Sequence, residues 1–196
     1  MKLIAGLGNP GDRYLHSRHN FGFMVLENLA RENNIPVSER RFDSLMGRGV
    51  LEGTPVILAK PQTFMNLSGI SLEKLVGYFK VPCEDVIVLH DDLDIVLGDI
   101  RIKQGGGDGG HKGVMSIIDH LGEAEFIRVR LGIGRPPADD MVESYVLKHF
   151  SAAEKAVVPG VITRATQAVL EIIASGAQAA MNRFNVRITN NSGKEV

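Results

Sequence analysis

Three groups of polar residues follow apolar segments of the sequence, and their side chains can do hydrolytic chemistry. They are Asn9 with His19 and Asn20, then Phe64-Met65-Asn66, then His90-Asp91-Asp92-Leu93-Asp94. In α/β proteins, sites usually form at the carboxyl ends of strands and in the loops that follow them. These three groups are therefore the candidate functional site.

The residue types in these groups suit the attack of water on an ester. A neutral histidine can take a proton from water, and a carboxylate bound to its other ring nitrogen fixes the tautomer. Asparagine amides can donate hydrogen bonds to a carbonyl oxygen that gains charge. His19, Asp91, Asn9 and Asn66 supply these parts without a covalent nucleophile. Spacing alone does not pair His19 with Asp91, because they lie on different elements.

Each candidate also has a simpler interpretation. A lone histidine such as His19 is more often structural or exposed than catalytic. The carboxylates of Asp91, Asp92 and Asp94 could bind a cation, although the glycine and glutamate spacing of a dedicated calcium loop is missing. Asn66 could cap a helix. These alternatives stay open at the level of sequence.

The segment Gly6-Leu7-Gly8-Asn9-Pro10-Gly11 fits the pattern G-x-G-x-x-G, which in other proteins binds dinucleotides. In those proteins the helix begins inside the motif, whereas here helical periodicity begins only around Phe21. No acidic residue closes a second strand about 20 residues later, where a ribose hydroxyl would need it. A tight turn is the better interpretation of the glycines, but it leaves Asn9 unexplained.

The apolar pattern predicts one α/β domain, residues 1–188, with a mixed sheet flanked by helices. Strands are expected at 2–7, 50–51, 56–60, 86–89, 100–103 and 127–133, with a hairpin through Gly53-Thr54-Pro55 between the second and third, and the run 86–89 is typical of a central strand. Helices are expected at 21–32, 72–79 (capped from Asn66 or Ser68), 114–121 and after 151. Ser151 and Glu154 have capping-box spacing, Pro159-Gly160 should kink or delay that helix, and Gly176 should stop it.

In the strand at 127–133, Arg128 and Arg130 fall on the face opposite the apolar residues. The polar tail, residues 189–196, is expected to fray.

Composition narrows the class of protein. The chain has 196 residues, a formal net charge of −1 and a single cysteine, Cys83. The charge does not announce a nucleic-acid partner, and one cysteine excludes an internal disulfide and a cysteine-rich zinc site. The apolar start is too short for a signal peptide, and no stretch is expected to reach membrane-spanning length, which favours the cytoplasm.

Several motifs, in order along the chain, together resemble the bacterial peptidyl-tRNA hydrolases. The resemblance runs from about Lys2 to about Asn185. It is carried by Gly6–Gly11, Tyr14, Arg18-His19-Asn20, Pro61–Gly69, His90–Asp94, Gly105–Gly113 and Arg128–Pro136.

The resemblance implies a monomeric esterase, with a twisted mixed sheet, that needs no metal or other cofactor. It would cleave the ester between a peptide and its transfer RNA, with no obligatory protein partner. His19 would be the general base and Asp91 its orienting partner. Asn9 would distinguish an acylated amino group from a free one.

The resemblance also implies substrate-binding residues. Tyr14, Phe64, Met65, Asn66 and His111 would lie around the terminal adenosine and the peptide. Lys103 and Arg130 would grip the 5′-phosphate of the tRNA, which gives affinity without reading bases.

One departure from the family concerns Lys112, which stands in the substrate-binding loop where the family commonly has asparagine. A lysine offers only donors, so it could meet a phosphate or the oxyanion but cannot accept a hydrogen bond from water. The alternative function is a non-catalytic RNA-binding relative, with Lys112 as the trace of lost chemistry. Intact His19 and Asp91 argue against that alternative.

Overall fold

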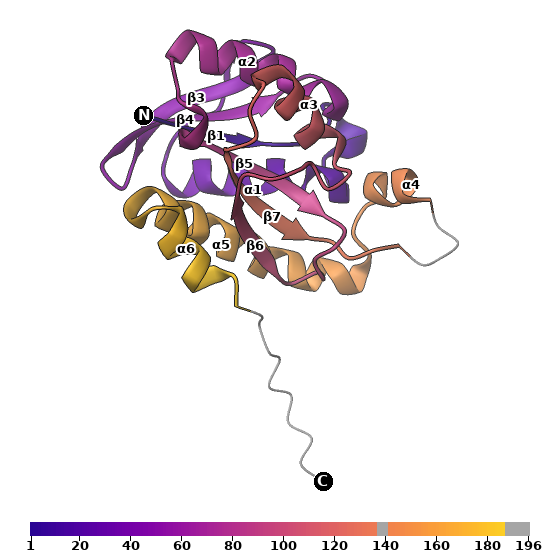
Figure 1. The fold of residues 1–196 in the computed structure, drawn as a ribbon. Coiled ribbons are helices and arrows are strands. Elements are labelled where there is room, and N and C mark those ends of the chain that lie inside the picture. Colours follow the sequence, from indigo (N-terminus) through magenta and orange to yellow (C-terminus); the bar gives the residue numbers. More distant parts are fainter. Residues whose placement is uncertain (137–140, 187–196) are drawn as a thin grey trace.

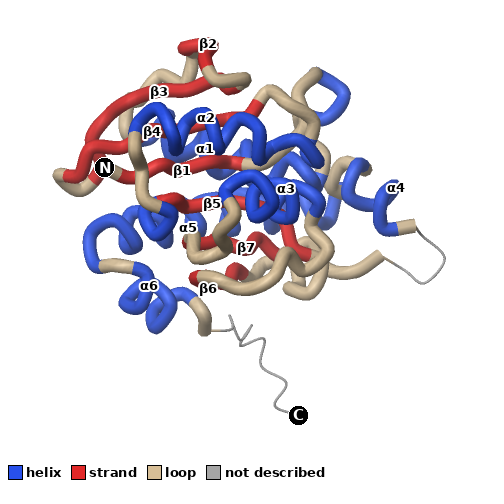
Figure 2. The backbone as a smooth tube through the Cα atoms, turned by 45° about the horizontal axis from the view of Figure 1, so that its top comes forward, coloured by secondary structure: helices blue, strands red, loops and turns tan. Residues whose placement is uncertain are grey.

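The computed structural model describes residues 1–136 and 141–186, so the tail expected at 189–196 lies outside the described residues. Its centre is a seven-stranded mixed sheet with the order β2-β3-β4-β1-β5-β7-β6 (Figures 1 and 2). The strands are β1 (Lys2–Gly6), β2 (Glu39–Arg41), β3 (Ser44–Leu51), β4 (Thr54–Pro61), β5 (Val86–Asp92), β6 (Ile100–Gln104) and β7 (Ile127–Gly132). The expected fold class, a single α/β domain with a mixed sheet, is confirmed.

The four central strands, β4, β1, β5 and β7, are parallel, so their carboxyl ends share one edge of the sheet. The outer strands β2, β3 and β6 pair antiparallel with their neighbours. The expected hairpin between β3 and β4 is present, and Glu52 and Gly53 at its turn both have positive φ, 45° and 74°. Such φ values at two consecutive residues match the twist of a two-residue hairpin.

Helices cover both faces of the sheet, as Figure 1 shows. One face packs against α1 (Phe21–Glu32), α5 (Ala152–Ser175) and α6 (Ala177–Phe184), and the other against α2 (Ser68–Phe79) and α3 (Lys112–Leu121). The short α4 (Val142–Leu147) lies at one side of the domain. Along β5, Ile87 and Leu89 join the first core and Val86 and Val88 the second. This burial on both faces explains the continuous apolar run of β5.

The amino end of α1 lies unusually close to the ends of β1 and β5. A Cβ atom added to Gly22 would lie 2.2 Å from the carbonyl oxygen of Leu89, and one added to Gly6 would lie 2.5 Å from the carbonyl oxygen of Gly22. Only glycine permits this approach. The short 3₁₀ turn η2 (Arg18–Asn20), which leads into α1, is thereby held beside the end of β5.

The long helix α5 begins as expected and differs from expectation in two ways. The capping box of Ser151 and Glu154 is formed, and the helix stops before Gly176. Pro159 lies inside the helix and does not delay its start. By length and composition α5 could span a membrane, so the expectation that no segment could do so was wrong. Its buried side chains, including Val161 and Ile172, pack into the core, so α5 is a core helix.

Other differences concern caps and short elements. Neither Asn66 nor Ser68 caps α2, because the Ser68 hydroxyl donates to the carbonyl of Met65 and the helix has no side-chain cap. The sequence did not reveal β2, α4 or α6. Arg128 lies on the face of β7 opposite its apolar residues, but it is buried, because the loop that leads to α3 covers it.

Candidate active site

His19 and Asp91 meet at the carboxyl edge of the sheet. His19 lies in η2 and Asp91 near the end of β5, and both are buried. The Nδ1 atom of His19 lies 2.9 Å and 3.0 Å from the two carboxylate oxygens of Asp91. The structure therefore joins two residues that sequence spacing could not pair.

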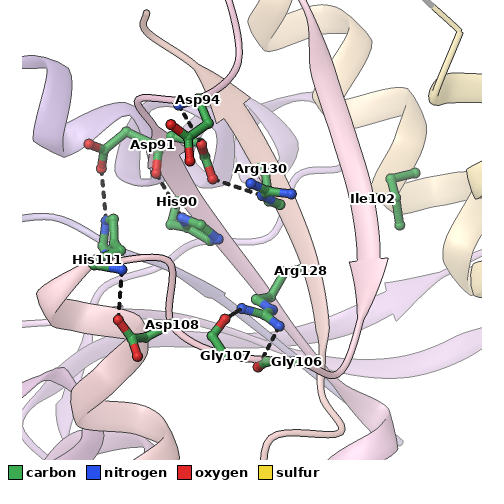
Figure 3. A network of polar contacts seen from close by, with 12 residues as sticks. His90, Asp91, Asp94, Ile102, Gly106, Gly107, Asp108, His111, Arg128 and Arg130 are labelled. Atoms are coloured by element: carbon green, nitrogen blue, oxygen red, sulfur yellow. Dashed lines mark hydrogen bonds and ion pairs between the residues drawn. The ribbon is translucent and has the colours of Figure 1, made fainter. Parts of the chain in front are cut away.

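A second imidazole, that of His111, also contacts Asp91 (Figure 3). Its Nε2 lies 3.0 Å from Oδ1 of Asp91. Its Nδ1 caps α3 by accepting hydrogen bonds from the backbone amides of Gly113 and Val114, both at 3.2 Å. Because Nδ1 accepts, the ring proton lies on Nε2, and His111 donates it to Asp91.

The same logic fixes the tautomer of His19. The carboxylate of Asp91 can only accept, so Nδ1 of His19 carries a proton and Nε2 does not. Nε2 of His19 has no hydrogen-bond partner within residues 1–136 and 141–186. The ring lines a pocket, so this unprotonated nitrogen can take a proton from a bound water.

The charge of Asp91 is stabilised by the two imidazoles. Burial by itself would raise the pKa of Asp91, but His19 and then His111 outweigh it and hold the pKa well below its ordinary value. Asp91 therefore stays ionised at neutral pH.

The neighbouring residue, His90, is buried and neutral. Its Nδ1 lies 2.7 Å from the carbonyl oxygen of Asp91, and the centres of the His90 and His111 rings are 4.8 Å apart. Burial, followed by the nearby His111, lowers the pKa of His90 well below its ordinary range.

His19, Asp91 and His111 lie close enough to hold a metal ion, since one ligand atom from each falls within 4.8 Å of the others. The hydrogen-bond pattern favours a proton network instead. The amides at Nδ1 of His111 keep the proton on Nε2, which is the nitrogen that faces the other two residues. A protonated nitrogen has no lone pair for a metal.

The other carboxylates of the 90–94 segment face different partners. Asp92 accepts from Nε of Arg130 at 2.7 Å, and Asp94 accepts from Arg135 at 2.5 Å. Because each carboxylate has its own partner, the arrangement does not favour a cation shared by Asp91, Asp92 and Asp94.

Asn9 is held in one orientation beside His19. The side chain of Asn20 accepts from the backbone amide of Asn9 at 2.8 Å and donates to its carbonyl at 3.0 Å. The side-chain oxygen of Asn9 accepts from the backbone amide of Met65 at 2.7 Å. The side-chain amide nitrogen of Asn9 is therefore the group left to donate to a ligand in the pocket.

Asn9, His19 and Asp91 line a pocket of about 370 Å³ between the sheet edge, α3 and α4. Phe64 stands half exposed at its wall, 53% accessible, while Met65 is buried beneath it. Most of the predicted site residues line this pocket, namely Asn9, His19, Phe64, Met65, Asn66, Asp91, His111 and Lys112.

The remaining predicted residues lie outside the pocket. The ring of Tyr14 lies below the guanidinium of Arg13, at 4.5 Å. Lys103 on β6 and Arg130 on β7 lie on adjacent strands and are diagonal neighbours, because Lys103 is opposite Arg128 and Arg130 is opposite Arg101. They thus share a face of the sheet, as two groups that bind one phosphate would need to.

Lys112 lies at the mouth of the pocket, where its ammonium pairs with the carboxylate of Glu143 in α4. Both side chains are largely exposed, 55% and 69%. The hydrogen bond from Lys112 lowers the pKa of Glu143. The pair therefore links α3 and α4 across the rim.

Sequence reasoning gave no role to four residues that support the site: Arg18, Asn20, His90 and Arg128. The first three are direct neighbours in the chain of His19 or Asp91, and this adjacency was the available signal. Arg128 carried no such signal, because its contacts are with a loop more than 20 residues away.

The chain is similar to known proteins along nearly its whole length. The family model for peptidyl-tRNA hydrolase matches residues 3–193. A peptidyl-tRNA hydrolase of Caldanaerobacter subterraneus subsp. tengcongensis is 50% identical over 94% of this chain and 100% of its own length. One from Thermoanaerobacter sp. (strain X514) is 48% identical over the same shares.

Solved structures agree with these similarities. The crystal structure of peptidyl-tRNA hydrolase from Acinetobacter baumannii superposes with a TM-score of 0.89 at 37% identity, and the match covers 95% of each chain. The similarity thus extends over the sheet, the helices and the pocket.

Proposed function

The chain belongs to the peptidyl-tRNA hydrolase family and is a hydrolase of the ester bond in peptidyl-tRNA, and we propose that His19 is its general base. The observation that carries this proposal is the contact between Nδ1 of His19 and the carboxylate of Asp91 at the wall of the pocket. This contact leaves Nε2 of His19 unprotonated and facing the pocket.

The proposed reaction begins with a water molecule bound at Nε2 of His19. As the water oxygen bonds to the ester carbon, the imidazole takes its proton, and Asp91 stabilises the imidazolium. The bond from the ester carbon to the ribose oxygen then breaks, and the imidazolium returns the proton to that oxygen. The products are the free peptide acid and a tRNA with its terminal hydroxyl restored.

Two asparagine amides serve the substrate in this proposal. The side-chain amide nitrogen of Asn9 donates to the acyl group on the α-amino nitrogen of the esterified residue. Ordinary aminoacyl-tRNA lacks this acyl group, so the contact distinguishes the two substrates. The side-chain amide of Asn66 donates to the carbonyl oxygen of the ester, which gains negative charge as water attacks. Phe64 and Met65 pack against the terminal adenosine or the peptide, and Tyr14 lies farther along the same substrate.

Lys103 and Arg130 are proposed to bind the 5′-phosphate of the tRNA. Lys103 is exposed, and Nε of Arg130 donates to Asp92 at 2.7 Å, which restricts the orientation of the guanidinium. Two cations that meet one phosphate supply affinity independent of base sequence. Replacing either with Met should weaken tRNA binding and reduce its salt dependence.

The enzyme is proposed to act as a monomer in the cytoplasm, without an obligatory protein partner. Both edges of the sheet are protected against pairing with another chain. All three residues of β2 are charged, and the Asn185 side chain occupies both backbone groups of Ile102 on β6, at 2.7 and 3.0 Å. Light scattering at assay concentrations tests this proposal, and a dimer there would contradict it.

The test of the proposed base is the release of labelled N-acetyl-amino acid from tRNA. The His19→Ala variant should lose about 10²- to 10⁴-fold in kcat, while its affinity for the tRNA stays within about threefold. His16→Ala, which replaces an exposed histidine outside the pocket, is the matched control. Equal turnover by His19→Ala and the parent enzyme would refute the assignment.

A further inference from the structure

Arg128 has an environment that the proposed mechanism does not explain. It lies on β7 with 3% of its surface exposed, and it forms no ion pair with any carboxylate of the described residues. Its guanidinium instead donates to three consecutive backbone carbonyls of the glycine-rich loop that precedes α3, and Figure 3 shows those of Gly106 and Gly107. Nη1 donates to Gly107 at 2.6 Å, and Nη2 donates to Gly106 at 2.8 Å and also to Gly105.

The glycines allow the loop to turn its carbonyls toward one cation. Gly105 and Gly106 have φ values of 72° and 89°, which side chains rarely adopt. A Cβ atom on Gly106 would lie 2.6 Å from Nζ of Lys103 and 3.3 Å from Nη2 of Arg128. The three glycines therefore fit the guanidinium, and carbonyl dipoles replace the hydration that its two terminal nitrogens lose.

The same loop leads directly to His111. After Gly107, the carbonyl of Asp108 accepts from the backbone amide of His111 at 3.2 Å, and its carboxylate accepts from the amide of Gly110 at 2.7 Å. His111 then donates to Asp91, which contacts His19. A continuous series of contacts thus joins the guanidinium of Arg128 to the proposed base.

We propose that Arg128 is a positioning residue for hydrolysis, because it fixes the glycine loop that presents His111 to Asp91. This inference rests on the proposed roles of His19 and Asp91. Without the guanidinium, three carbonyls lose their donor, the loop relaxes, and Asp91 loses one of the two N–H groups that fix its carboxylate. The chemical step then slows while the tRNA-binding side chains remain.

The first test compares Arg128→Met with Arg164→Met in the release of labelled N-acetyl-amino acid from tRNA. Arg164 is a matched control, because its guanidinium also donates to backbone carbonyls, those of Phe184 at 3.0 Å and Val186 at 3.1 Å, far from the pocket. Arg128→Met should lower kcat by about 10- to 100-fold, since small misplacement of reacting groups has effects of that size. KM should change less than about threefold.

A double-mutant cycle tests whether Arg128 acts through His111. If it does, Arg128→Met should slow the His111→Ala enzyme by less than about threefold, although it slows the parent much more. Independent, multiplicative losses would overturn the proposal. A raised KM with unchanged kcat would also overturn it, because Arg128 would then serve tRNA binding alone.

Gly106→Ala provides a second variant if Arg128→Met fails to fold. It keeps the arginine but strains the loop at a φ of 89°, so it should reproduce the loss in kcat, and parental kcat in a folded protein would overturn the proposal. His19→Ala is measured in parallel. Activity in His19→Ala would refute the proposed base and leave the cycle between Arg128 and His111 interpretable by itself.

Discussion

The two imidazoles that contact Asp91 are supported by two buried arginines in different ways. Arg18 directly precedes His19, and its Nη1 donates to the carbonyl of His149 at 3.0 Å, while its Nη2 donates to Glu154 at 2.6 Å. The Arg18 guanidinium also lies 4.2 Å from the centre of the Tyr145 ring. The His19 side of the site is thus braced against α4 and α5 by charge, hydrogen bonds and an aromatic ring.

On the His111 side, the hydrogen-bond partners of Arg128 among the described residues are all backbone carbonyls. Burial, followed by the neighbouring Arg130, lowers the pKa of Arg128, but an arginine still carries its charge at neutral pH. One support thus contains a titratable hydrogen-bond partner, Glu154, whereas the hydrogen bonds of the other go to backbone carbonyls, which do not titrate. The two sides should therefore respond differently to substitution and to acid.

The largest effect should come from Asp91, which both sides share. In Asp91→Asn, an amide nitrogen replaces one of the oxygens that accept from the imidazoles. Because the capped helix fixes the tautomer of His111, the amide nitrogen should face His19 and drive its proton from Nδ1 to Nε2. We expect kcat to fall by about 10³- to 10⁴-fold, as when a triad aspartate is replaced.

Asp94→Asn is the matched control for this change, since Asp94 pairs with Arg135 and does not line the pocket. The pH dependence of kcat gives the second readout. An Asp91→Asn enzyme that keeps the parental pH profile would show that Asp91 does not orient the base.

The next largest effect should come from Arg18→Met, which breaks the brace on the His19 side. Arg18 is buried while Glu154 is partly exposed, so removing the guanidinium leaves the carbonyl of His149 and the carboxylate of Glu154 without a donor and costs about 1–3 kcal/mol of unfolding free energy. We expect kcat to fall by about 10- to 100-fold through displacement of His19. Urea unfolding and steady-state kinetics measure the two effects.

Arg183→Met is the control for Arg18→Met, because Arg183 pairs with Glu171 at the surface. Equal small losses in stability for both variants would mean that Arg18 does not brace η2.

A smaller effect should come from Glu154→Gln, and it should depend on pH. Burial tends to raise the pKa of Glu154, but hydrogen bonds from Arg18 and Ser151 outweigh it and lower the pKa below its ordinary value of 4.5. Such a group stabilises the fold fully above that ordinary value, and the contribution is lost as the pH falls through the lower folded-state pKa.

The Glu154→Gln variant can keep the capping box, so it loses only the charge. We expect the free energy of unfolding to fall by about 0.5–1 kcal/mol at pH 7, a small value because solvent screens the partly exposed Glu154. The difference in unfolding free energy between this variant and the parent enzyme, measured by urea titration, should disappear at strongly acidic pH. A difference that is the same at every pH would contradict the assignment.

The smallest effect should come from the rim of the pocket. Lys112→Asn and Glu143→Gln each break an exposed ion pair, which contributes little in water. We expect kcat to change by less than about fivefold, with any change in KM reduced at high salt. A loss as large as that of Arg18→Met would show that Lys112 contacts the reacting groups.

The sequence was informative where local pattern decides structure. The apolar run of β5, the bounds of α1, the hairpin and the capping box of α5 follow from local pattern, and the structure confirms them. In contrast, β2 (Glu39–Arg41) has three charged residues and no apolar alternation. It pairs only because β3 offers a free edge, and no local pattern shows this.

The site divides in the same way. The residue types at the strand ends indicated hydrolysis, but the contact between His19 and Asp91 depends on the tight packing of Gly6 against Gly22. That contact joins residues 72 positions apart. Alternation also suggested an exposed face for Arg128, and only the path of the glycine loop buries it.

The pleat of β5 separates two neighbouring carboxylates. Asp91 follows the face of Ile87 and Leu89 and meets imidazole, whereas Asp92 turns to the other face and meets the guanidinium of Arg130. A shift of one residue in the register of β5 would exchange these surroundings. Insertion or deletion of one residue within β5 should therefore be far less tolerated than most single substitutions there. It would turn Asp91 toward Arg130 and leave His19 without its carboxylate.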